Sequence, residues 1–197
     1  MTRAALLVAI AAFALAAAAC GGSKSTASHP QEYAIYGEYA RGSNKLMKNN
    51  LNRRVFNKVE AQAGSDIHLN DDGSVTLKPG TYHITGYSIT TMQVTFAPPQ
   101  PKHDSNYPGY ALVYPVADET AGESLLQHVI GIGSPQTALD GTPSLFDLVY
   151  ATKEETKIAV GHQSGADLHN EVYLSVYEVA GTPSNYHVFA RISITKL

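Results

Sequence analysis

The sequence predicts an all-β fold, an antiparallel sandwich or barrel, on two observations. Near the carboxyl terminus, residues 172–177 (VYLSVY) and 188–194 (VFARISI) alternate inward- and outward-facing side chains, and a period of two is typical of strands with one buried face. From residue 55 onward the chain consists of short strand-like runs. Turn signals at 71–73, 78–80, 140–141 and 181–183 separate these runs. Many short strands punctuated in this way are typical of sandwiches and barrels.

The amino-terminal segment has the character of a signal rather than of a folded domain. Arg3 precedes an apolar, alanine-rich run from Ala4 to Ala19. The run is short and alanine-rich for a membrane-spanning helix, which favours a secretory signal. It ends at Cys20, the only cysteine of the chain, within the sequence Ala-Ala-Ala-Cys-Gly. We therefore expect residues 1–19 to be a cleaved signal peptide.

This arrangement resembles the lipobox of bacterial lipoproteins, in which small residues precede a cysteine that becomes lipidated. The resemblance implies that Cys20 carries a covalent lipid and that the protein is held in the bacterial cell envelope. Gly21, directly after the cysteine, is similar to the pattern that directs lipoproteins to the outer membrane. Two or more acyl chains anchor a protein stably, whereas one gives marginal binding. The membrane is therefore the first expected partner, and no cofactor besides this lipid is expected.

Composition limits the remaining possibilities. With one cysteine, the chain can form no internal disulfide and no thiolate zinc site. A chain of this size buries roughly 70% of its unfolded surface, so one domain with an apolar core is sufficient. The formal net charge is −3, whereas a general nucleic-acid binder is basic. We therefore expect no nucleic-acid partner.

The domain organisation follows from the order of these segments. Residues 20–31 (CGGSKSTASHPQ) are small and polar and predict a flexible, lipidated tether. Residues 32–54 are expected to form an amino-terminal extension with a short helix over 43–52, for which Ser43 is the candidate N-cap. The β-sandwich is expected to span 55–197. Its further strands are predicted at 55–61, 66–69, 74–77, 81–96, 110–116, 126–132, 145–151 and 156–162.

Several short motifs resemble one sandwich family. They are Phe56-Asn57-Lys58-Val59, Gly73-Ser74-Val75, Pro79-Gly80-Thr81-Tyr82 and Asn170-Glu171-Val172-Tyr173-Leu174. This pattern resembles the jelly-roll domain shared by complement globular heads and tumour necrosis factor ligands. The resemblance implies ten strands in two Greek-key sheets, frequent assembly as a homotrimer, and binding rather than catalysis. No calcium ligand or receptor-binding residue of that family has a matching position here.

A basic window follows the tether. It contains five cations without an intervening acid: Lys45, Lys48, Arg53, Arg54 and Lys58. Each lysine or arginine near an anionic membrane surface contributes about 1 kcal/mol to binding. Since the window lies soon after the tether in sequence, we predict contact with anionic lipid or an envelope polymer. The alternative is a solvated helix face or strand edge.

Two patterns suggest a metal site, although we favour its absence. His162, Asp167, His169 and Glu171 are nitrogen and oxygen ligand types that suit zinc or manganese. Clustered histidines near turns are more often surface residues. The segment from Gly73 through Pro79 and Gly80 to His83 resembles part of the second cupin motif, but the first motif with its paired histidines is missing. A metal-dependent enzyme of cupin type is therefore kept as an alternative.

Together these patterns predict a membrane-anchored envelope lipoprotein. We expect it to act as a binding or assembly module without catalysis, with a protein or an envelope polymer as its partner. The alternatives are the metal-dependent enzyme, which would use His83 or the 162–171 cluster, and a structural protein of the envelope.

Overall fold

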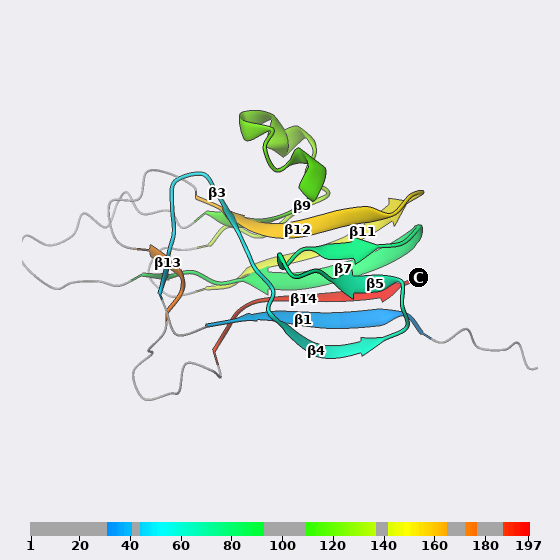
Figure 1. Ribbon diagram of the computed structural model, residues 1–197. Helices are drawn as coiled ribbons and strands as arrows, with labels where there is room; N and C mark the ends of the chain where they lie inside the picture. Colours follow the sequence, from blue (N-terminus) through cyan, green and yellow to red (C-terminus); the bar gives the residue numbers. More distant parts are fainter. Residues whose placement is uncertain (1–30, 41–43, 93–108, 137–141, 165–171, 177–186) are drawn as a thin grey trace, which may run out of the picture.

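The computed structural model describes residues 31–40, 44–92, 109–136, 142–164, 172–176 and 187–197. Within these ranges the regular structure is mostly β-strand, and the paired strands run antiparallel. Two sheets pack face to face (Figure 1). The predicted all-β antiparallel sandwich is therefore confirmed. Cys20, the signal segment 1–19 and all but the last residue of the tether lie outside the described residues.

Sheet 1 contains five strands. In spatial order these are β11 (Ser144–Thr152), β7 (Gly80–Ser88), β14 (Val188–Lys196), β1 (Tyr33–Tyr39) and β4 (Lys58–Ala63). Strand β1 lies between β14 and β4, so that Tyr36 pairs with Ile192 on one side and with Val59 on the other. The first and last strands of the described chain are thus neighbours inside one sheet.

Sheet 2 covers the inner face of sheet 1. Its main path is β10 (Gly131–Ile132), β9 (Tyr110–Pro115), β12 (Thr156–Gln163), β6 (Val75–Leu77) and β5 (Ile67–Leu69), and β3 (Leu51–Arg53) also pairs with β12. A third, small sheet, called here the end sheet, contains β2 (Lys45–Leu46), β13 (Val172–Ser175) and β8 (Thr91–Met92). It lies at one end of the sandwich (Figure 1).

The core lies between the two large sheets and follows the alternation of the strands. Sheet 1 contributes Ile84, Ile192 and Ile194, while sheet 2 contributes Ile158 and Val160, all of them buried. Branched aliphatic side chains pack well on a pleated surface, which explains why these segments form strands. The alternation predicted over 188–194 is confirmed by β14.

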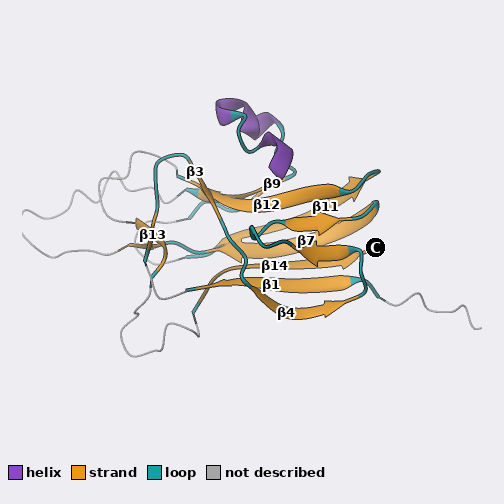
Figure 2. Ribbon diagram, in the orientation of Figure 1, coloured by secondary structure: helices purple, strands orange, loops and turns teal. Residues whose placement is uncertain are grey.

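Helical turns occupy little of the described chain. Figure 2 shows them beside sheet 2, where η2 (Val116–Asp118) and η3 (Gly122–Gln127) are 3-10 turns after β9. The strand predicted over 126–132 is therefore wrong for its first part, and only Gly131–Ile132 pairs with β9. None of the helices in the described ranges is both long and apolar enough to cross a membrane.

The amino-terminal extension predicted over 32–54 is also wrong, because β1, β2 and β3 pair with strands of the sandwich. The predicted helix over 43–52 is absent from its described part, residues 44–52. There the Asn52 side chain closes a loop, since its Oδ1 accepts from Lys48 N at 2.8 Å and its Nδ2 donates to Lys48 O at 2.7 Å. Asparagine side chains compete with helical backbone bonds in this way.

The course of β1 relates the two ends of the sandwich. Tyr33 pairs with Thr195, near the carboxyl-terminal Leu197, whereas Glu38 reaches the end where Lys45 pairs with Ser175. Five residues of strand span about 17 Å. The basic window therefore begins at the opposite end of the sandwich from Tyr33.

Candidate functional site

Three of the predicted residues meet in a buried polar cluster beside the end sheet. We call it the Arg54 network, and its members are Glu38, Lys45, Arg54, Ser88 and His162. They come from β1, β2, β7, β12 and the segment after β3. Two of the predicted surface cations and one predicted metal ligand thus meet in a single cluster.

Arg54 is the centre of this network. Its side chain is 0% exposed, and its Nε donates to Ser88 Oγ at 2.8 Å. Nη1 donates to Glu38 Oε2 at 3.3 Å and to the carbonyl of Leu174 at 2.6 Å, while Nη2 donates to the carbonyl of Ile89. The planar fork of donors in a guanidinium suits such a set of partners. Burial lowers the pKa of Arg54, and the charge of Glu38 opposes this shift.

Glu38 joins a second cation to the network. Its Oε1 accepts from Lys45 Nζ at 3.2 Å, and the same ammonium donates to the carbonyl of Arg53 at 2.7 Å. The carboxylate is therefore shared between a fully buried guanidinium and a partly exposed ammonium. Burying a charge is costly unless it is paired and hydrogen-bonded, and here both conditions are met.

Ser88 connects Arg54 to His162. Ser88 Oγ lies 2.7 Å from His162 Nδ1. Because Arg54 Nε can only donate, Ser88 Oγ accepts from it, and the direction of the bond between Ser88 and His162 is set by the imidazole tautomer. Both Ser88 and His162 are fully buried. This serine is therefore an interior link in a hydrogen-bonded chain and is not presented to solvent as a nucleophile.

The other metal candidates do not join this cluster in the described chain. Asp167, His169 and Glu171 lie outside the described residues. His83 lies on the outer face of sheet 1, where its Nε2 is 2.7 Å from Asp147 Oδ1. It is five residues from Ser88 along β7 and on the opposite face, which places about 17 Å of strand between them. Among the described residues, no group of three or more histidine, cysteine or acidic side chains could hold a metal ion.

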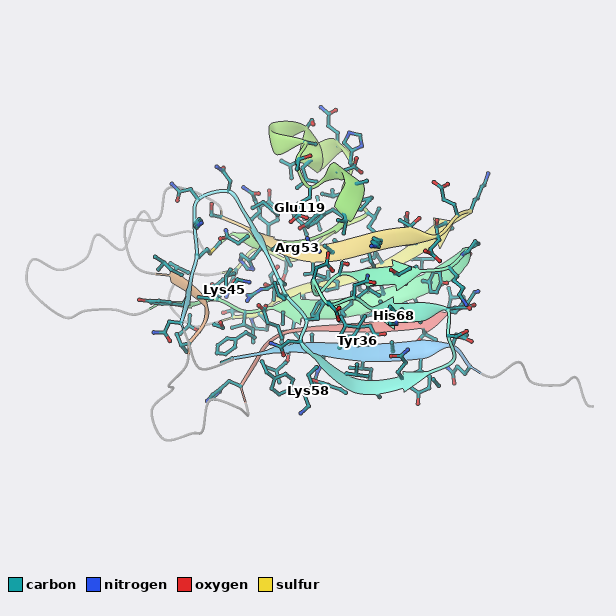
Figure 3. The ribbon with its side chains drawn as sticks, in the orientation of Figure 1. Tyr36, Lys45, Arg53, Lys58, His68 and Glu119 are labelled. Carbon is teal, nitrogen blue, oxygen red and sulfur yellow. The ribbon has the colours of Figure 1, made fainter. Side chains whose placement is uncertain are left out.

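The basic window does not form one surface. Figure 3 shows Arg53, Lys45 and Lys58 on different parts of the molecule. Arg53 pairs with Asp72 at 3.0 Å and with Glu119 at 2.8 Å. For Arg54 the predicted surface contact is wrong, because the side chain is entirely buried.

In the basic window, whose cations all lie in the described chain, only two of the cations are exposed. Lys58 lies over the ring of Tyr39, with Nζ 4.5 Å from the ring centre, and Lys48 lies beside the end sheet. Contact of Lys48 or Lys58 with an anionic surface stays a prediction.

A turn beside Arg53 is held by side-chain bonds of its own. Asp72 Oδ1 accepts from the hydroxyl of Ser74 at 2.6 Å and from its backbone N–H at 3.0 Å. These bonds lower the pKa of Asp72 to about 2, and the charge of Arg53 adds to the shift. The turn is completed by Gly73, whose φ of 78° is unfavourable for other residues.

Sequence reasoning missed Glu38 and Ser88, although each carried a signal. On β1 the inward positions are Ala34 and Tyr36, and Glu38 continues that series. On β7, Ser88 continues the inward series from Tyr82 and Ile84. A polar residue in an inward series requires a buried partner.

Comparison with known proteins adds no assignment. No family model matches the chain, and a search of curated proteins finds no related sequence.

Proposed function

We propose that this chain is a bacterial envelope lipoprotein, anchored through lipid on Cys20, whose sandwich acts as a binding or assembly module without catalysis. The lipobox-like segment supports the anchor and the envelope location. The observation that carries the binding role is the Arg54 network, which joins β1, β7, β12 and β13 beneath one end of the sandwich. A surface held by such fixed internal bonds loses little entropy when it binds a partner.

We further propose that the sandwich is a jelly roll. Support comes from nested pairing among eight strands in chain order: β1, β6, β7, β9, β10, β11, β12 and β14. The first pairs with the last, the second with the seventh, the third with the sixth and the fourth with the fifth. Such nesting, divided between two sheets, is typical of the double Greek key of jelly rolls.

The proposed orientation follows from the course of β1. A fully extended tether of 12 residues spans at most ~40 Å, and it would join the sandwich near Tyr33. The Arg54 network lies at the other end of β1. We therefore assign the membrane-proximal role to the end with Leu197 and the partner-binding role to the end with the end sheet. Outer-membrane location and homotrimeric assembly belong to the same proposal, and light scattering tests the trimer.

The anchor is tested by mass spectrometry of the native amino terminus and by membrane fractionation. We expect an acylated Cys20 and a membrane-bound protein that Cys20→Ala releases. An unmodified terminus, or cleavage at another bond, would overturn the anchor.

The binding end is tested by cross-linking in native membranes with two charge reversals. Lys48→Glu alters the network end, and Lys153→Glu alters the turn after β11, beside the end with Leu197. We expect loss of the cross-linked partner only with Lys48→Glu. Equal capture by both variants would contradict the proposed polarity.

Metal analysis separates this proposal from the cupin-like enzyme. Stoichiometric zinc or manganese that is lost in His162→Ala or His83→Ala would favour the enzyme. Protein without bound metal, together with a partner captured at the network end, would favour the binding module. A homogeneous assembly that captures no other envelope component would favour the structural alternative.

A further inference from the structure

A surface feature separate from the Arg54 network lies on the outer face of sheet 1, on the opposite side of β7 from the buried Ser88. A shallow groove there crosses β11, β7 and β14, and the side chains that line it are Thr85, Tyr87, Leu145, Asp147, Arg191 and Ser193. The register places them in two rows. Asp147, Thr85 and Ser193 form one row, and Leu145, Tyr87 and Arg191 form the other.

The depth of the groove comes from residue size. Thr85 and Ser193 have small side chains. Their row is bordered by the larger Tyr87 and Arg191 on one side and by His83 on the other. Beneath the groove, on the inward side of β7, a Cβ on Gly86 would meet the Arg191 carbonyl oxygen at 2.2 Å and the ring of the core residue Phe146 at 2.5 Å. Glycine at this position therefore allows three strands to lie close beneath the groove.

The groove carries hydrogen-bonding capacity that the described chain leaves unused. No hydrogen bond within the described chain engages the hydroxyl of Thr85, Ser193 or Tyr87. Asp147 is 73% exposed, and among the described residues its carboxylate bonds only through Oδ1, to His83. A sheet face with three available hydroxyls and a free carboxylate oxygen suits a ligand that is itself rich in hydroxyl groups.

The charges of the groove favour an uncharged ligand. The Arg191 guanidinium is held by Glu60, with Nη2 and Oε2 2.9 Å apart, and 42% of its side chain stays exposed. Asp147 has His83 beside it. Of the residues that the structure describes, no unpaired lysine or arginine lines the groove to attract phosphate or sulfate. The ring of Tyr87 adds a flat apolar surface with a polar tip, and such rings stack on apolar faces.

From this arrangement we propose that the outer face of sheet 1 binds a neutral carbohydrate chain, with a sugar ring on Tyr87 and its hydroxyls bonded to Asp147 and Arg191. The inference rests on the proposed function, because it takes the partner to be an envelope polymer. It adds that this polymer is a neutral carbohydrate and that it contacts sheet 1 as well as the end sheet. It predicts weak binding, with Kd on the order of 1 mM, because the groove is open and shallow.

The test is saturation-transfer NMR on the full chain as purified from the producing cells. The probes are three neutral tetrasaccharides, chitotetraose, maltotetraose and laminaritetraose. We expect saturation transfer to at least one probe. We also expect about tenfold weaker binding in Asp147→Asn, because a bond to a charged group is lost.

Further variants separate recognition from folding. Tyr87→Phe keeps the ring and is expected to keep most of the binding, whereas Tyr87→Ala is expected to remove it. Glu154→Gln is the matched control, an exposed carboxylate in the turn after β11, and it is expected to bind as the wild type does. A near-native circular dichroism spectrum identifies the variants that fold.

Two results would overturn this inference. The first is the absence of saturation transfer to all three probes at concentrations ten times the expected Kd. The second is equal binding of a probe by the wild type and by all three variants, Asp147→Asn, Tyr87→Phe and Tyr87→Ala. Either result leaves the acylation and cross-linking tests of the anchored module untouched. Conversely, an unmodified Cys20 would not remove sugar binding measured in solution.

Discussion

The Arg54 guanidinium and the Glu38 carboxylate form an ion pair inside the sandwich, with Nη1 and Oε2 3.3 Å apart and side chains 0% and 5% exposed. The pair joins the segment after β3 to β1, two parts of the chain that occupy different sheets. Lys45 shares the same carboxylate. Integrity of this end of the sandwich therefore depends on a few charged groups in addition to apolar packing.

Arg54→Met is expected to destabilise the fold by about 3 kcal/mol, because it leaves Glu38 buried without its main partner. Urea unfolding followed by circular dichroism measures the change. Lys48→Met, at an exposed position in the same window, is the control and is expected to stay within about 0.5 kcal/mol of wild type. Equal stability of Arg54→Met and wild type would contradict the importance assigned to the network.

Ser88→Ala is expected to cost about 1–3 kcal/mol, because Arg54 Nε and His162 Nδ1 both lose a buried partner. The same unfolding measurement applies. Ser65→Ala serves as the comparison, since that residue is exposed and its hydroxyl meets only Lys78, at 3.3 Å, within the described chain. Similar stabilities for the two alanine variants would show that the serine link contributes nothing.

Gly73→Ala is expected to destabilise by roughly 1–3 kcal/mol, because alanine is strained at a φ of 78°. In addition, its Cβ would lie 2.7 Å from Val55 Cα. Thermal unfolding measures the effect. Asp71→Ala changes the exposed neighbour in the same turn, and a loss as large as that of Gly73→Ala would point to the turn's composition rather than to backbone strain.

The lowered pKa of Asp72 predicts that the stability of the fold depends on pH in the acidic range. This pKa is lowered from 3.8 to about 2 by the Ser74 bonds and by Arg53. A lowered pKa in the folded state means stabilisation that is present above pH 3.8 and lost as the pH falls toward 2. The side chain is half exposed, so solvent screening keeps the contribution small.

Urea midpoints measured between pH 2 and pH 5 test this dependence. We expect the wild-type midpoint to fall more steeply on acidification than that of Asp72→Asn. Asp71→Asn is the control and is expected to follow the wild type. Parallel curves for wild type and Asp72→Asn would refute the assignment to Asp72.

The fold class was predictable because the alternation in β14 is local and strong. The placement of β1 was not, since Tyr33–Tyr39 carries three tyrosines and a glutamate and lacks a clean alternation of apolar residues. Its two partners lie at very different distances from β1 along the chain. β4 follows soon after it, whereas β14 lies about 150 residues away, and pairing over that distance leaves no local signal in the sequence. The strand was therefore assigned to an extension outside the sandwich.

The network was predictable only in part. Sequence reasoning selected His162 as a possible metal ligand, and it selected Lys45 and Arg54 on the assumption that neighbours in sequence share a surface. In an extended chain, successive side chains point to opposite faces. Arg53 accordingly meets Glu119 at the surface, while Arg54 turns inward to Glu38. Charge counts along the chain cannot distinguish these two directions, whereas the inward series on β1 and β7 could have shown that Glu38 and Ser88 need buried partners.

The position of β1 between two antiparallel neighbours has a mechanical consequence. A pull applied to Tyr33 along the strand axis acts across the hydrogen bonds to β14 and to β4. These bonds lie perpendicular to the strands, so the pull loads them together in shear instead of breaking them one after another. The sandwich is thus built to resist a pulling force that is applied through the residues before β1.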